Sequence, residues 1–151
     1  MKPRKMNRYP PVGFHYIVSF NGIGNKIIDT RFQSVSGLSV EMEQEQVIEG
    51  GENRFTHALP LRSNYSDLVL KRGMARDSDL VDWFMDAFEN MKIQPVSMII
   101  SLLNENKMPL VSWNIVHAWP KKWSVSDFDA EKSALVIETL ELSYRTFSII
   151  R

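Results

Sequence analysis

Apolar and polar residues alternate over much of the chain, and a two-residue period predicts strands with one buried face. The clearest run lies near the C-terminus, where Leu140, Leu142 and Tyr144 share one face. Glu141, Ser143 and Arg145 share the other. This alternation, or a cluster of aromatic and β-branched residues, predicts strands over 14–20, 36–48, 67–74, 96–103, 110–117 and 134–147.

A different period marks one segment as helical. From 77 to 91 the apolar residues recur at spacings of three and four, which places them on one helix face. They are Leu80, Trp83, Phe84, Ala87, Phe88 and Met91. Asp77 or Ser78 suits the N-cap, and Pro95 ends the helix. The pattern predicts a mainly β, α+β chain: an antiparallel β-sandwich or split β-barrel with one flanking helix.

Neither period holds between residues 49 and 60. Glycines at 50 and 51 break regular structure, and Pro60 cannot donate to a central ladder. We predict a long loop or protruding hairpin here. This segment and the end of the strand before it contain Val47, Ile48, Phe55, His57 and Leu59, and exposure of such apolar or aromatic side chains to water would destabilise a monomer.

Composition narrows the class of protein. With 151 residues we expect a single domain over 1–151, in which 1–12 form a basic N-terminal extension without a secretion signal. No run of about 18 apolar residues occurs, so we expect synthesis in the cytoplasm and no membrane anchor. Eighteen basic residues balance eighteen acidic ones, which removes the charge signature of nucleic-acid binding.

The search for chemistry finds no catalytic, cofactor or metal site. There is no cysteine, and His15, His57 and His117 lack the spacing of a zinc motif. Two alternatives stay open. One is a small hydrolase using Glu41 and Glu43, which line one predicted strand face together with Glu45. The other is a carbohydrate-binding module using Trp119 and Trp123, which lie beside Lys121 and Lys122. We expect that the protein is not an enzyme.

Several segments taken together resemble a known family. They are Phe32 to Leu38 with the acidic strand that follows, Leu70 to Met74 leading into the helix with Trp83, and the C-terminal third from Val111 through Phe128 to Tyr144. In order and spacing the chain is similar to the inner tail-tube proteins of contractile phage tails and extracellular contractile injection systems. These are related to the hemolysin-coregulated protein of type VI secretion.

This resemblance implies a structural role. Six subunits would form a ring, and rings would stack into a hollow tube that sheath contraction drives through a target envelope with its cargo. The segment 46–61 would be an inter-ring loop, and Val47, Ile48, Phe55, His57 and Leu59 would make the contact. Polar residues would face the lumen, namely Glu41, Glu43, Ser143 and Arg145.

The resemblance also implies partners and leaves one alternative. The expected partners are further copies of the chain, a sheath protein, baseplate and tube-initiator proteins, a tail terminator or cap, and cargo in the lumen. We expect the protein in an assembled particle or virion tail. A tube-initiator or adaptor ring at the baseplate fits the same residues, so tube and initiator are not separated by the sequence.

Overall fold

The computed structural model describes residues 13, 15–23, 26–48 and 56–151, of which 47–48 and 56–58 are described by their backbone alone. In this part of the chain, seven strands form one antiparallel sheet in the order β1-β6-β7-β8-β5-β2, with β9 also paired to β7. A separate two-stranded sheet joins β3 to β4. The strands are β1 (Tyr16–Phe20), β2 (Ser34–Ser36), β3 (Val40–Ile48), β4 (Thr56–Tyr65), β5 (Leu68–Gly73), β6 (Val96–Leu103), β7 (Pro109–Val125), β8 (Ile137–Ser143) and β9 (Thr146–Ile150).

The long strand β7 belongs to two layers. Its first part pairs with β6 and β9, and from Trp119 onward it pairs with β8. The register shifts between Pro120 and Lys122, and His117 has a φ of 54°. Because such irregularities bend and twist a strand, β7 passes from one layer into the other. We call these the β6 layer (β1, β6, the first part of β7, and β9) and the β8 layer (the second part of β7, β8, β5 and β2).

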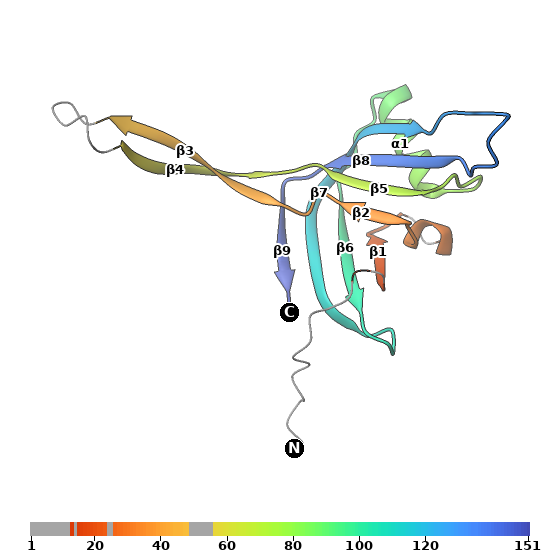
Figure 1. The fold of residues 1–151 in the computed structure, drawn as a ribbon, viewed down its shortest axis with the longest axis horizontal. Helices are drawn as coiled ribbons and strands as arrows, with labels where there is room; N and C mark the ends of the chain where they lie inside the picture. The colour runs from red at the N-terminus through yellow and green to blue at the C-terminus, as the bar shows by residue number, and fades with distance from the viewer. Residues whose placement is uncertain (1–12, 14, 24–25, 49–55) are drawn as a thin grey trace, which may run out of the picture.

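The two layers cross steeply in Figure 1 and enclose the hydrophobic core. The predicted antiparallel sandwich or split barrel with one helix is confirmed. Leucines at every second position of β5 and β8 supply one side of the core. The buried cluster consists of Val18, Phe20, Leu68, Leu70, Leu80, Trp83, Phe84, Met98, Ile100, Ile115, Ala118, Leu140, Leu142 and Tyr144.

The helix α1 (Asp79–Asn90) lies where the sequence predicted it. Ser78 is the N-cap, and its Oγ accepts a hydrogen bond from the Val81 N–H at 3.3 Å. At the other end Met91 is left-handed, with a φ of 52°. The predicted apolar stripe was too wide, because Phe88 and Met91 are 42% and 77% exposed and only the first part of the stripe reaches the core.

Three predicted strands have other bounds in the structure. The run 36–48 is interrupted at Gly37, which has a φ of 98° and lies so close to the Asp67 carbonyl that a Cβ would stand 1.9 Å from its oxygen. The run 134–147 splits into β8 and β9. The segment after His117, predicted to be a connection, continues β7 because Pro120 sits at the bulge, where a missing N–H is tolerated.

A buried ion cluster links the β8 layer to the helix and to the 3-10 turn η1 (Ile27–Thr30). Arg72 is 3% exposed and donates to Asp29 at 2.8 Å and to Glu138 at 2.9 Å, and both carboxylates are fully buried. It also donates to Ser78 Oγ at 2.7 Å, while Trp123 Nε1 donates to Glu138 at 2.8 Å. The cluster therefore fixes η1 and the start of α1 against β5 and β8.

The sequence itself carries a signal for this cluster. Arg72 continues the buried phase of Leu68 and Leu70, and Glu138 continues that of Leu140. The two charged residues are also register partners across β5 and β8. Opposite charges at core positions of two neighbouring strands indicate a buried ion pair.

Replacement of Arg72 by Met should destabilise the fold strongly. The change leaves the carboxylates of Asp29 and Glu138 buried without their cation, and breaking such a cluster costs about 3–5 kcal/mol. Urea unfolding followed by circular dichroism measures the free energy of unfolding. The control Lys71→Met on the exposed face of β5 should change it by less than about 0.5 kcal/mol. Equal effects of the two variants would contradict the role of the cluster.

Candidate functional site

The hairpin of β3 and β4 forms an arm that projects from the two layers (Figure 1). The protruding hairpin predicted at 46–61 is thus present, but most of this range is strand and not loop. Pairing runs from Val40 opposite Tyr65 to Ile48 opposite Thr56. Pro60 is accommodated because both outer edges of a two-stranded sheet are free of ladder bonds. Phe55, predicted to be a contact residue, lies outside the described residues.

Apolar side chains of the arm are uncovered. In an antiparallel pair, residues directly opposite one another share a face, and so do positions two apart. Val40 and Met42 therefore share one face, whereas an extra residue of β4 between Pro60 and Ser63 puts Leu59 on the other face, opposite Glu45. Together with Leu61 we call these four the apolar arm residues. Their exposed fractions are 50%, 50%, 49% and 58%. Nothing within the described residues buries these side chains, although each could contribute to a core.

Polar side chains accompany the apolar ones on the arm. Arg62 Nε donates to Glu43 Oε2 at 2.9 Å, and Glu41 stands opposite Asn64. The register shifts between Met42 and Gln44, so that Glu45 pairs with Leu59. The predicted single face of Glu41, Glu43 and Glu45 agrees with this register, because the extra residue lies in β4 and β3 keeps its two-residue alternation.

Aromatic side chains anchor the base of the arm. Tyr65, the last residue of β4, packs edge-on against Phe147 and Tyr144, with ring centroids 5.1 and 5.9 Å apart. Burial raises the pKa of Tyr144 to about 12, and its hydroxyl faces the Gly37 carbonyl at 3.4 Å. Each ring pair adds about 0.5–1.5 kcal/mol beyond its buried area. The direction in which the arm leaves the body is therefore set by its base.

Asp67, between β4 and β5, joins the base to the β8 layer. It is ion-paired with Lys121 and accepts a hydrogen bond from Ser143 Oγ at 3.0 Å. The bond from Lys121 holds the pKa of the Asp67 carboxyl below its ordinary value of 3.8. Because the pKa of Asp67 is lower in the folded than in the unfolded state, the ionised carboxylate stabilises the fold at pH values above 3.8. This stabilisation is lost as the pH falls below 3.8 and through the folded-state pKa.

Replacement of Asp67 by Asn should therefore flatten the acid side of the stability curve. Thermal unfolding at about pH 7 and about pH 3 measures the change, and the loss of melting temperature between them should be smaller in the variant. The exposed Asp127→Asn on the β7–β8 loop serves as control. The ion pair contributes nothing if Asp67→Asn and Asp127→Asn follow the wild-type curve alike.

The residues predicted to face the lumen lie on two parts of the molecule. Glu41 and Glu43 are on the arm. Ser143 ends β8 and is bonded to Asp67, while the backbone N–H of Arg145 donates to the Val116 carbonyl at 3.0 Å. Their common exposure to a channel is not tested by a single copy and stays a prediction. The backbone register sets Val47 opposite His57 near the outer end of the arm.

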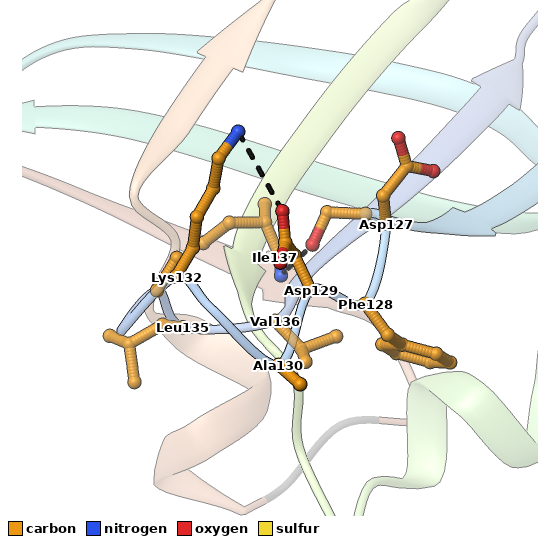
Figure 2. Close-up of a pocket in the computed structure, with 10 residues that line it drawn as sticks. Asp127, Phe128, Asp129, Ala130, Lys132, Leu135, Val136 and Ile137 are labelled. Carbon is orange, nitrogen blue, oxygen red and sulfur yellow. Dashed lines mark hydrogen bonds and ion pairs between the residues drawn. The ribbon is translucent and has the colours of Figure 1, made fainter.

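A loop between β7 and β8 borders an open pocket of 1010 Å³ at the end of the β8 layer remote from the arm (Figures 1 and 2). Its polar groups hold the loop together. Lys132 lies 4.0 Å from Asp129, and the Ile137 N–H donates to Ser126 Oγ at 2.8 Å. Phe128 and Leu135 are 78% and 83% exposed. The loop therefore offers apolar side chains for contact.

The geometry does not favour the two alternative chemistries. A carbohydrate or nucleotide platform needs an aromatic ring free to stack, whereas Trp123 packs against the core and donates to buried Glu138. A hydrolase needs one carboxyl group in apolar surroundings, whereas Glu43 is on the exposed arm and paired with Arg62. Within the described residues no group of three His, Asp or Glu side chains is placed to hold a metal ion.

Comparison with protein families identifies the family of this chain. The family described as T4-like virus tail tube protein gp19 matches residues 12–148. The chain belongs to this family. A search of curated proteins gave no match.

Solved structures agree with a tail tube protein. A chain of the anti-feeding prophage baseplate, determined with 6-fold symmetry, is 35% identical with a TM-score of 0.84; the match covers 94% of this chain and 96% of that one. A chain of an extracellular contractile injection system, in its sheath-tube complex, is 23% identical with a TM-score of 0.79, covering 95% and 93%. Hcp1 from Salmonella typhimurium shares the fold at 14% identity, with a TM-score of 0.59 and coverage of 89% and 83%.

Proposed function

We propose that this tail tube protein acts by self-assembly, with six copies in a ring and rings stacked into the hollow inner tube of a contractile injection particle. The observation that carries the proposal is the arm, which extends beyond its own body and leaves the apolar arm residues exposed. An isolated two-stranded hairpin is marginally stable in water. Such an arm gains stability when other protein surfaces cover these side chains.

The relatives support the same arrangement. The 35% identical chain comes from a 6-fold symmetrised baseplate, and another similar chain from a sheath-tube complex. Contacts that close by rotation give a ring, while contacts along the axis stay open and give a filament. We infer that the sheath, baseplate components and a terminating cap are partners of the tube, and that the chain is made in the cytoplasm as a single domain with 1–12 as an extension.

In this tube the polar side chains would line the channel. Glu41, Glu43, Ser143 and Arg145 are candidates, because a water-filled channel that cargo crosses requires groups that stay hydrated. The protein would have no catalytic activity of its own. Within the described residues no helix is long and apolar enough to span a membrane.

Electron microscopy tests both the assembly and its joints. Negatively stained protein should show rings about 80–100 Å across and stacks of them, since a compact globule of this mass measures only about 30–35 Å. Substitution of Val47 and Ile48 by Asp should keep rings but remove stacks, because a charge buried in a ring-to-ring contact costs several kcal/mol. Asn106→Asp in the exposed β6–β7 turn should stack normally.

Two results would contradict the proposal at different points. If the wild-type protein stays monomeric at high concentration and forms no ring on a purified baseplate, assembly as a tube fails. If the Val47 and Ile48 variant stacks as well as the wild type, the ring-to-ring contact lies elsewhere.

A second candidate is a tube-initiator ring at the baseplate. It is favoured by the 35% identity to the baseplate chain, compared with 23% to the chain of the sheath-tube complex. Quantitative mass spectrometry of purified particles separates the two. About six copies in each particle indicate an initiator ring, whereas many multiples of six indicate the repeating tube subunit.

A further inference from the structure

The inner face of the β6 layer is covered less at one end than at the other. At one end the cross-strand neighbours Phe20 and Met98 are buried, and the ring of Phe20 lies 6.1 Å from that of Trp83 on the helix. At the other end of the same face, the neighbours Tyr16 and Leu102 are only half-buried. The chain enters the sheet at this less covered end, because β1 begins with Tyr16.

An apolar groove of 330 Å³ lies at this end, between the two layers. Tyr16, Ile100, Leu102 and Trp113 line it from the β6 layer, and Val35 and Leu38 line it from β2 and the residues after it. The lining also includes Gln33 and Ser34 but no charged side chain. At about 30 Å³ for each molecule in liquid water, the groove has room for about eleven waters. Replacement of this water by an apolar segment would be favourable.

Gly13 identifies the segment that can reach the groove. This residue is itself part of the lining, and a Cβ built on it would meet no atom within 4 Å, so the space beside it is open. Tyr9, Pro10, Pro11 and Val12 precede it directly. Four residues in the polyproline II conformation span about 12 Å, at about 3.1 Å each. The chain before Gly13 therefore starts at the groove and is long enough to cross it.

The composition of residues 9–12 suits a groove of this kind. Each proline fixes its own φ and keeps the residue before it extended, so the segment loses little conformational entropy when it is ordered. Pro10 and Pro11 also lack an N–H, so their burial leaves no backbone donor without a partner. Proline-rich segments bind in grooves lined by aromatic side chains, and here Tyr16 and Trp113 supply them.

We propose that residues 9–12 form an intramolecular strap, in which the rings of Pro10 and Pro11 lie in this groove and cover the open end of the sandwich. The strap contacts both layers and adds to the hydrogen bond that Tyr16 Oη donates to the Phe32 carbonyl at 2.6 Å. The basic residues of 1–8 all come before the strap, so their charges stay in water. The inference goes beyond the tube function, because it concerns one subunit before it meets another copy.

Engineered disulfides test the position of the strap, because the natural chain has no cysteine. Pro10→Cys is combined with Val35→Cys in one chain, and the monomer fraction is oxidised mildly. A disulfide needs Cβ atoms within about 4.5 Å of each other, so a docked strap should give a faster-migrating monomer band on a non-reducing gel. The matched control combines Pro10→Cys with Ser36→Cys, the next residue of β2, which points to the other face of the sheet. It should give at least about tenfold less of this band.

Replacement of both prolines gives a second readout that does not depend on oxidation. The double variant Pro10→Ser and Pro11→Ser should lower the melting temperature of the monomer by about 2–4 °C, because the groove loses its apolar cover. It should also increase the fluorescence of the dye ANS, which binds exposed hydrophobic surface, by at least about twofold. The control Pro3→Ser lies among the basic residues of the same segment and should change neither quantity.

Three results would overturn the strap. In the first, Pro10→Cys pairs equally with Val35→Cys and with Ser36→Cys, which means that the segment does not lie in the groove. In the second, the disulfide links two chains into a dimer, which gives the groove to the N-terminal segment of another copy. In the third, the double proline variant and Pro3→Ser have the same melting temperature and dye binding. None of these results changes the tube function, which microscopy of the wild-type protein tests separately.

Discussion

The arm cannot bury its own apolar side chains, and the arrangement of the rest of the molecule follows from this constraint. A two-stranded sheet has only two faces and no second layer, so Val40, Met42, Leu59 and Leu61 stay in water unless another chain covers them. A monomeric protein would lose little by replacing such residues with polar ones. Their presence indicates that the folded state on which selection acts is an assembly, in agreement with membership of the tail tube family.

The body of the subunit holds the arm in a defined direction. The ion cluster around Arg72 ties β5, β8, η1 and the N-terminus of α1 together, while the rings of Tyr65, Tyr144 and Phe147 fix the base of the arm. Both groups are buried or half-buried, so their geometry varies little. A tube requires this precision, because a small error in the direction of each arm would accumulate from one subunit to the next.

Local patterns in the sequence were sufficient for the helix and for most strands. Ser78 was recognisable as an N-cap, and Val96 to Leu103 had the bounds that the structure shows. The strand β4 was missed although Leu59, Leu61 and Tyr65 have a two-residue period, because Pro60 and the glycines at 50 and 51 suggested a loop. The split at Gly37 depends on the approach of the Asp67 backbone from a distant part of the chain, and no local pattern reports it.

The sequence by itself determined the class of the fold, the position of the protruding hairpin and, through resemblance, the family. These depend on side-chain periodicity and on the order of segments, which are properties of neighbouring residues. Only the tertiary structure decided which residues of the arm share a face, since an extra residue of β4 between Pro60 and Ser63 turns Leu59 to the face of Glu45. It alone showed that β7 belongs to both layers, because this follows from its pairing with β6 and β9 in its first part and with β8 beyond Trp119.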